Sequence, residues 1–246
     1  MSGVPAGYKR IVLASETCAV VREAEASDVE QILQTRTLHE WAGTRDDRRA
    51  LQGRAIAWAV TLPGGTPVVV RHSEHGGMLA PLTGDRFLAP TRAPHELSTA
   101  LWLESAGVPT PQIVAYAVYP AGPLVRRSDV ASEEVRNARD LGHYCVDGGS
   151  ALDEALELTT VLLESMDRAG VHHPDMNVKN VLIGNRAGQR IAWLLDVDRV
   201  RRVKPGAGMR ANVQRLTRSM RRWNQRFDAR VSAEQIGRIS RLGAAT

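Results

Sequence analysis

The sequence of 246 residues predicts an α+β fold with a strand-rich first part and a mostly helical second part. Two patterns support this prediction. Short runs rich in β-branched residues, separated by glycine and proline turns, dominate up to about residue 130. Longer stretches with apolar residues every three or four positions dominate after it. Strands followed by helices, rather than a strict alternation of the two, are typical of the α+β class.

The first fifty residues contain two short apolar runs, at residues 11–13 and 19–21, that are long enough for strands. Residues 28–41 have helical spacing. The inward positions of that helix would be filled by Val29, Ile32, Leu33 and Leu38. The sequence alone assigns this region no role.

A β-hairpin is predicted after this region. Residues 55–62 and 67–72 have the alternation and the β-branched content of strands, and Pro-Gly-Gly-Thr at 63–66 is a turn signal. Two further strands are expected at residues 114–119 and 123–130. Together these strands would form a small sheet around the helix that lies between them in the sequence.

Three further helices are predicted from apolar spacing. The first covers residues 92–106 and is ended by Gly107, the second covers residues 152–169 and is stopped by Gly170, and the third lies within the last fifty residues. Their apolar positions are, in chain order, Leu97, Ala100, Leu101 and Leu103; Leu152, Leu156, Val161, Leu162 and Met166; and Val213, Leu216, Met220 and Trp223.

Cysteine content and hydropathy indicate the compartment in which the protein works. The chain has two cysteines, Cys18 and Cys145, in no metal-binding spacing, so we expect free thiols and a reducing, cytoplasmic compartment. No apolar run approaches the roughly 20 residues that a membrane-spanning helix requires. The chain is therefore not expected to cross a membrane by itself.

The net charge of +5 is unevenly distributed. From Arg199 to the end of the chain there are 13 basic and 2 acidic residues, whereas residues 1–198 have 19 basic and 25 acidic residues. A basic segment of this kind is suited to nucleic acid, an anionic membrane surface or a phosphorylated substrate. It could equally be a solvated helix face.

One polar stretch indicates chemistry. His173, Asp175 and Asn180 have the spacing H-x-D-x-x-x-x-N, and Asp196 follows sixteen residues later at the end of an apolar strand. This spacing resembles that of a kinase catalytic loop, in which the Asp accepts the proton of the attacking hydroxyl and the Asn and a later Asp bind Mg²⁺. An Asp and an Asn five residues apart could also simply cap a turn, but the His and the strand-borne Asp196 favour the catalytic interpretation.

Further motifs extend this resemblance to the lipopolysaccharide kinase (Kdo/WaaP) family, and most closely to 3-deoxy-D-manno-octulosonic acid (Kdo) kinases. The resemblance covers about residues 50–226. It rests on Gly53-Arg54-Ala55, Arg71-His72, Gly76-Gly77, Gly84-Asp85-Arg86-Phe87, Glu96, residues 107–111, residues 173–183 and residues 195–202. It implies a protein-kinase-like bilobal fold, with a small β-rich lobe at residues 1–136 and a mostly helical catalytic lobe at 137–246. The first fifty residues match poorly.

The resemblance also implies roles for individual residues. Asp175 and His173 would be catalytic, Asn180 and Asp196 would bind Mg²⁺, and ATP would be the phosphate donor. The residues implied to bind ATP are Gly53, Arg54, Arg71, Glu96 and Glu133, and those implied to bind the acceptor are Arg199, Arg201 and Arg202. Arg71 occupies the place of the phosphate-binding lysine of protein kinases, and an arginine there is a fixed cation with a bidentate fork.

The family further implies an ATP-dependent kinase that phosphorylates the Kdo residue of a Kdo-lipid A precursor. Such an enzyme would work at the cytoplasmic face of the inner membrane, with a lipid-linked anionic saccharide and the anionic membrane surface as partners and without nucleic acid. Two alternatives stay open. The chain could be a kinase for another small hydroxyl compound or for protein Ser/Thr, or a catalytically weak kinase-like module that binds anions.

Overall fold

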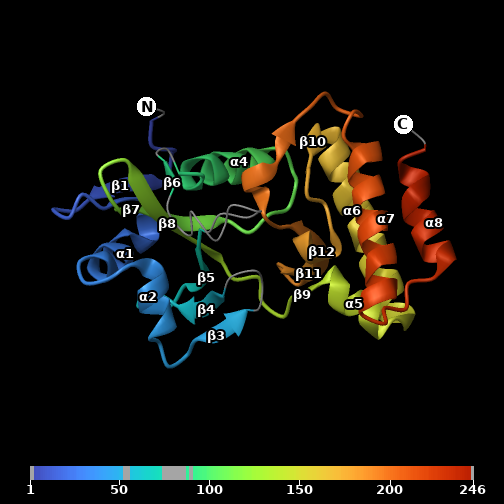
Figure 1. Ribbon diagram of the computed structural model, residues 1–246, viewed down its shortest axis with the longest axis horizontal. Helices are drawn as coiled ribbons and strands as arrows, with labels where there is room; N and C mark the ends of the chain where they lie inside the picture. Colours follow the sequence, from blue (N-terminus) through green and yellow to red (C-terminus); the bar gives the residue numbers. More distant parts are fainter. Residues whose placement is uncertain (1–2, 52–55, 74–86, 89–90, 245–246) are drawn as a thin grey trace. The chain divides into compact units, whose positions relative to one another are not determined.

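The computed structural model describes residues 3–51, 56–73, 87–88 and 91–244 (Figure 1). The chain divides into two compact units. Unit 1 comprises Met1–Leu97 and Gln112–Glu134, and unit 2 comprises Ser98–Pro111 and Val135–Thr246. The mixture of helices and strands confirms the predicted α+β class.

The described strands of unit 1 form one antiparallel sheet with the order β1-β2-β7-β8-β5-β4-β3, and β6 pairs with β8 beside this path. Its strands are β1 (Tyr8–Val12), β2 (Cys18–Arg22), β3 (Arg49–Leu51), β4 (Ala57–Thr61), β5 (Pro67–His72), β6 (Phe87–Leu88), β7 (Ile113–Pro120) and β8 (Val125–Glu133). The predicted hairpin is present as β4 and β5. The strand predicted at 123–130 begins and ends later, so that Glu133 is its last residue.

The first fifty residues are an integral part of unit 1. They supply β1 and β2, which extend the sheet, the short helix η1 (Glu23–Glu25), and two helices, α1 (Ala26–Leu33) and α2 (Leu38–Gly43). The prediction of one continuous helix at residues 28–41 was therefore wrong. The chain begins a new helix at Leu38 because Thr37 caps it: the Thr37 hydroxyl accepts the N–H of Glu40, and the Glu40 carboxylate accepts the N–H of Thr37.

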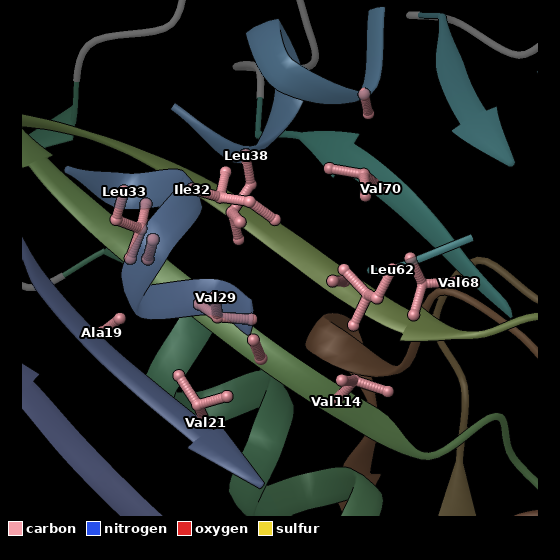
Figure 2. Close-up of a cluster of buried hydrophobic side chains, with 14 of the residues drawn as sticks. Ala19, Val21, Val29, Ile32, Leu33, Leu38, Leu62, Val68, Val70 and Val114 are labelled. Carbon is pink, nitrogen blue, oxygen red and sulfur yellow. The ribbon is translucent and has the colours of Figure 1, made fainter. Parts of the chain in front are cut away.

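The core of unit 1 lies between these two helices and one face of the sheet (Figure 2). Val29, Ile32 and Leu33 of α1 and Leu38 of α2 are buried, as their spacing predicted. Figure 2 shows them facing side chains of several strands, namely Ala19, Val21, Val68, Val70 and Val114. Helices α1 and α2 thus supply the helical side of this cluster.

The helix α4 (Ala93–Ser105) agrees with the predicted helix at 92–106. Leu97, Ala100 and Leu103 are buried, and Leu101 is half-buried. Gly107 follows with φ +75°, a left-handed conformation that glycine adopts without steric cost. The N–H of Val108 then returns to the backbone oxygen of Leu103 at 2.9 Å, which ends the helix.

Unit 2 is mostly helical. Its helices are α5 (Leu141–Asp147), α6 (Gly149–Arg168), α7 (Met209–Arg226) and α8 (Ala233–Leu242), with the short helices η2 (Val178–Asn180) and η3 (Val197–Arg199). Its strands are β9 (Arg139–Asp140), β10 (Val171–His172), β11 (Val181–Arg186), β12 (Gln189–Leu194) and β13 (Arg201–Arg202). The sequence patterns predicted α6, α7 and an apolar strand before Asp196, which is present as β12, but did not predict α5 or α8.

Helix α6 is the central element of unit 2, in contact with α5, α7, α8 and β12. Leu152, Leu156, Leu162 and Met166 are buried on it as predicted. Val161, also counted among its apolar positions, is 60% exposed, because it lies on the opposite face of the helix. Within the described part of the chain, no helix is long and apolar enough to span a bilayer. Both cysteines are free thiols, as expected.

Candidate functional site

The polar stretch after α6 forms a compact loop in unit 2. The loop begins at β10, where Val171 and His172 pair with Arg202 and Arg201 of β13 in antiparallel register. Gly170, with φ +66°, precedes it, and a Cβ atom there would lie 2.2 Å from the backbone oxygen of Val203. No side chain fits at that position, so the turn from α6 into the loop requires glycine.

His173 is fully buried inside this loop, and both of its ring nitrogens are engaged. The N–H of Asp175 donates to Nδ1 at 3.2 Å. Nε2 lies 3.1 Å from the backbone oxygen of Leu195, the residue before Asp196. Because Nδ1 accepts a hydrogen bond, Nε2 carries the ring hydrogen and donates a hydrogen bond to the backbone oxygen of Leu195. His173 therefore joins the Asp175 backbone to the segment that carries Asp196.

Asp175 lies in a turn that three residues of the loop close around its backbone. The side-chain amides of Asn177 and Asn180 both donate to the backbone oxygen of Asp175 at 2.8 Å. The N–H of Asn180 donates to the backbone oxygen of Asn177 at 3.1 Å. The Asp175 side chain is half-buried. These bonds hold the turn through the Asp175 backbone.

Asp196 is brought next to Asn180 by the β11–β12 hairpin. The N–H of Leu195 donates to the backbone oxygen of Asn180 at 2.9 Å. Asp196 itself has φ 58° and ψ 48°, the left-handed helical conformation that residues other than glycine seldom adopt. This backbone turn separates the strand from η3 and fixes the direction of the carboxylate. Backbone strain of this kind is often found at functional sites.

Asn212 of α7 is a site residue that the sequence analysis missed. It is fully buried, its Oδ1 accepts the N–H of His173 at 2.9 Å, and its Nδ2 donates to the backbone oxygen of Val171 at 2.8 Å. β10 pairs with β13, and the Asn212 amide bonds the backbone next to it as a second neighbouring strand would. A signal was present, because Asn212 is a polar residue between Met209, Val213 and Leu216 on the inward face of an amphipathic helix.

Gly208, at the start of α7, allows this close packing. A Cβ atom at Gly208 would lie 2.4 Å from the backbone oxygen of Val171. The N–H of Met209 donates to the carboxylate of Asp167 at 3.2 Å, which holds the start of α7 against the end of α6. Both helices therefore fix where this loop begins.

The three arginines that follow Asp196 have different surroundings. Arg199 is half-buried in η3, whereas Arg201 and Arg202 are exposed on β13. The guanidinium of Arg202 lies 4.2 Å from the centre of the Trp102 ring, a cation–π contact. Neighbouring residues of a strand point to opposite faces, so Arg201 is directed away from Trp102.

The start of the loop that contains His173 and Asp175 lies in positive potential. The pKa of His172 is held below its ordinary value, first by burial and then by the charges of Arg215 on α7 and Arg201 on β13. The imidazole is therefore neutral near pH 7. The fixed positive charges at this end of the loop come from arginines of two separate elements.

In unit 1, Arg71 and Glu96 form an ion pair. Arg71 lies in β5, opposite Val130 of β8 and Ala57 of β4, and its side chain is 39% exposed. Glu96, in the first turn of α4, is 7% exposed. The next residue, His72, contacts Asp129 instead, with Nδ1 and Oδ1 2.6 Å apart. The strand thus directs Arg71 toward α4.

Glu133 ends β8 and contacts residues of unit 1. Its N–H donates to the backbone oxygen of Gln112 at 2.8 Å, and its carboxylate lies 2.5 Å from the guanidinium of Arg22. The following residue, Glu134, forms an ion pair with Arg49. Gly53 and Arg54, the other two predicted ATP-binding residues, lie outside the described residues.

The described structure thus brings together four of the predicted residues in unit 2: His173, Asp175, Asn180 and Asp196. It joins Arg71 to Glu96 within unit 1 and gives Glu133 separate partners there. Among the residues described, no group of three or more His, Cys, Asp or Glu side chains forms a metal cage. Asn180 and Asp196 are instead a pair of hard oxygen donors, the kind of ligand that Mg²⁺ prefers when water and phosphate complete its coordination.

The sequence is similar to known proteins over most of its length. Residues 39–239 match the lipopolysaccharide kinase (Kdo/WaaP) family. The chain is 30% identical over 187 residues to a 3-deoxy-D-manno-octulosonic acid kinase of Vibrio parahaemolyticus, covering 74% of this chain and 76% of that protein. It is 34% identical over 173 residues to the enzyme of the same name from Xanthomonas oryzae pv. oryzae, covering 68% and 67%.

A solved structure described as WaaP in complex with acyl carrier protein has a similar fold. Its TM-score against this chain is 0.55 with 17% sequence identity, and the match covers 97% of this chain and 89% of that one. At this identity the similarity concerns the fold alone.

Proposed function

The chain belongs to the lipopolysaccharide kinase (Kdo/WaaP) family, and on this basis we propose that it transfers a phosphoryl group from ATP to the Kdo residue of a Kdo-lipid A precursor. The observation that carries the proposal is the single loop in which His173 and Asn180 hold Asp175 and Asp196 together. Phosphoryl transfer depends mainly on positioning and charge neutralisation, and this loop supplies groups for both.

Asp175 is the proposed general base. Its backbone is fixed by His173, Asn177 and Asn180, so its carboxylate can be presented to an acceptor hydroxyl without rearranging the turn. The carboxylate would accept the hydroxyl proton as the sugar oxygen bonds to the γ-phosphorus. The bond from that phosphorus to the β,γ-bridging oxygen would break, leaving ADP. His173 is buried away from the reacting atoms, and we assign it a positioning role.

Asn180 and Asp196 are the proposed Mg²⁺ ligands, and their chemistry fits the ion. The Nδ2 atom of Asn180 already donates to Asp175, which leaves its Oδ1 as the ligand atom. The carboxylate of Asp196 supplies a second oxygen from the adjacent strand end. When bound there, Mg²⁺ would neutralise phosphate charge. The protein contributes two rigidly held oxygens, which suits an ion that keeps several waters.

Arg71 is the proposed cation for the nucleotide phosphates in unit 1, and Glu96 holds it. The buried carboxylate of Glu96 fixes one edge of the guanidinium, and the side chain is still 39% exposed. An arginine has five N–H donors, so it can pair with Glu96 and still donate to a phosphate oxygen. Gly53, Arg54 and the segment at Glu133 complete the proposed nucleotide-binding residues.

Anionic groups of the acceptor are the proposed partners of Arg201 and Arg199, with Arg202 held against Trp102. Arg201 is exposed on the strand that pairs with the beginning of the catalytic loop. A positively charged group at this position would favour a phosphorylated or carboxylated saccharide over a neutral sugar. Kdo itself carries a carboxylate.

The lipid-linked acceptor places the proposed reaction at the cytoplasmic face of the inner membrane, and α7 has a face suited to an anionic surface. All six arginines of α7 are exposed: Arg210, Arg215, Arg218, Arg221, Arg222 and Arg226. The helix contains no acidic residue. Among the residues described, none of these arginines has an ion-pair partner. Each basic group near an anionic leaflet adds about 1 kcal/mol of binding free energy.

Transfer of labelled phosphate from ATP to Kdo-lipid A, with and without Mg²⁺, tests the proposed function. We expect transfer that requires both the acceptor and the metal. A panel with an aminoglycoside and a protein Ser/Thr substrate separates this reaction from other kinase activities. A folded protein that transfers phosphate to none of these acceptors would contradict the proposal and favour an anion-binding module.

A further inference from the structure

A cluster of charged and polar side chains in unit 1 surrounds Arg22, the last residue of β2. Its Nε and Nη2 atoms donate to the two carboxylate oxygens of Glu25 at 2.7 and 2.5 Å. Its Nη1 atom donates to Glu133 at 2.5 Å and to the side-chain oxygen of Gln112 at 3.1 Å. We call these four residues the Arg22 cluster. One guanidinium thus holds three partners.

The two distant members of the cluster mark the places where the chain enters and leaves unit 1. The chain passes from unit 2 into unit 1 at Gln112, and it leaves unit 1 after Glu134. Gln112 directly precedes β7, and Glu133 is the last residue of β8. The N–H of Glu133 also donates to the backbone oxygen of Gln112. Arg22, at the end of β2, therefore holds both the beginning of β7 and the end of β8.

The sheet is irregular at this end, which increases the need for such a side-chain contact. The register of β7 against β8 shifts between Ile113 and Ala115, so Val114 is an extra residue in β7. A bulge of this kind interrupts the ladder of backbone hydrogen bonds. Beyond it, the described backbone bond between Glu133 and Gln112 and the Arg22 cluster hold the two strand ends together.

The cluster is partly removed from water, so its charges act strongly on one another. The side chains of Glu25, Arg22 and Glu133 are 7%, 24% and 40% exposed. The hydrogen bond from Arg22 is the main cause that lowers the pKa of Glu25, and the bond to Glu25 likewise raises the pKa of Arg22. Removing Arg22 would leave two carboxylates near each other without a cation, and their repulsion would separate them.

Arg22 lies outside the part of the chain that matches the family, which begins at residue 39. It nevertheless fixes Glu133, which is among the residues proposed above to bind ATP, and the contact that we assign to its segment is with the nucleotide base. The N–H groups of Glu133 and Glu134 are already engaged with Gln112 and Pro67. The nucleotide base of ATP must therefore bind to other polar groups of this segment. The direction of those groups depends on where the end of β8 is held.

We propose that Arg22 is a positioning residue for the donor nucleotide: by joining Gln112 to Glu133, it holds the end of β8 in the conformation that binds the base of ATP. This inference rests on the proposed function and gives the N-terminal segment a part in it. Arg22 does not touch the reacting phosphate. Its loss therefore affects binding of the donor rather than the chemical step or the acceptor.

The test is the kinetics of Arg22→Gln against the parent protein. We expect the KM for ATP to rise about tenfold, as misplacement of a binding segment commonly weakens an interaction, with kcat and the KM for the acceptor almost unchanged. Arg22→Lys should recover part of the loss, because an ammonium keeps the charge without the bidentate fork. Glu133→Gln should raise the KM in the same direction. The double variant should be less than additive, because both changes break one contact.

Two controls separate positioning from general destabilisation. Val29→Ala removes buried volume in the core of unit 1 without touching the cluster, so it should lower stability and leave the KM for ATP unchanged. Arg10→Gln removes an exposed arginine of the neighbouring strand β1 and should change neither property. Hydrogen exchange adds a readout that needs no activity, since the amide of Glu133 should exchange faster in Arg22→Gln than in either control.

The outcomes distinguish this inference from the proposed function. A parent protein that binds no ATP overturns the proposed function and this inference with it. A parent that binds ATP, together with an unchanged KM in Arg22→Gln, overturns the inference alone. The inference also fails if Val29→Ala raises the KM for ATP as much as Arg22→Gln does.

Discussion

The side-chain nitrogen of Asn180 lies 2.8 Å from the backbone oxygen of Asp175, five residues earlier in the chain. Asn177 donates to the same oxygen at the same distance. The two residues that the proposed reaction requires, a base and a metal ligand, are therefore part of one hydrogen-bonded turn. Because the nitrogen of the Asn180 amide is fixed, the direction of its oxygen is fixed as well. This relationship leads to separate predictions for the base, the metal ligands and the residues that support them.

Asp175→Ala should remove most phosphoryl transfer while leaving the fold intact. The turn is held by the Asp175 backbone, which the substitution keeps, whereas loss of a positioned general base typically costs about 10²–10⁴-fold in rate. Steady-state kinetics and circular dichroism of the purified variant would measure both effects. Turnover close to that of the parent in a folded Asp175→Ala protein would rule out this residue as the base.

Asn180→Ala and Asp196→Ala should each weaken Mg²⁺-dependent ATP binding, with a combined loss smaller than the sum because both serve one ion. Titration of ATP at several Mg²⁺ concentrations would show this. Asp196→Gly provides a matched control for strain, because glycine adopts φ 58° freely. The Asp196→Gly variant should be more stable than Asp196→Ala and equally defective in Mg²⁺-dependent ATP binding. ATP binding by the parent that is indifferent to Mg²⁺ would contradict a shared metal site.

Asn212→Ala should destabilise the protein and slow catalysis together. It leaves the buried N–H of His173 and the backbone oxygen of Val171 without their partner, at about 1–3 kcal/mol of unfolding free energy for each unsatisfied group. Denaturant unfolding and kcat would measure the two effects. Gln214→Ala, at an exposed position of the same helix, is the matched control and should change neither. Normal kcat in Asn212→Ala would show that the amide does not position the loop.

The arginines near the catalytic loop and those on α7 should have different effects. Arg201→Ala should impair transfer even to a soluble, delipidated acceptor, because Arg201 pairs with the strand that begins the loop. Replacing Arg221 and Arg222 by Gln should instead weaken binding to anionic vesicles and spare the soluble reaction. Vesicle binding should also weaken at high salt, where the Debye length falls below about 10 Å. If both variants behave alike in both assays, it is wrong to assign Arg201 to acceptor binding and Arg221 and Arg222 to membrane binding.

Stability should depend on Glu25 in acid. Hydrogen bonding to Arg22 lowers the pKa of Glu25 in the folded protein, so the ionised form stabilises the fold. This contribution is complete above the unfolded pKa of about 4.3, and it is lost as the pH falls through the lower folded value. Denaturant unfolding between about pH 3 and 6 should therefore show a steeper loss of stability in the parent than in Glu25→Gln. An equal dependence of the unfolding free energy on pH in the two proteins would show that the pair of Arg22 and Glu25 contributes little to stability.

Local patterns predicted much of the fold because they depend on neighbouring residues. Apolar spacing identified α4, α6 and α7, and the hairpin of β4 and β5 followed from its turn residues. The spacing failed at residues 28–41, where the capping pair of Thr37 and Glu40 divides one apparent helix into two. It also placed Val161 among the apolar positions of α6, although this residue is exposed. Apolar content alone does not decide which side of a helix meets the core.

The sequence by itself determined the α+β class, and it singled out the loop that contains His173, Asp175 and Asn180, because their spacing is a local property of the chain. Only the tertiary structure revealed the partners of that loop and the role of the first fifty residues. Asn212 supports His173 from 39 residues away, and Arg22 reaches Gln112 and Glu133 across 90 and 111 residues. Such contacts depend on how helices and strands pack, and no periodicity within one segment encodes which distant residue will complete a hydrogen bond.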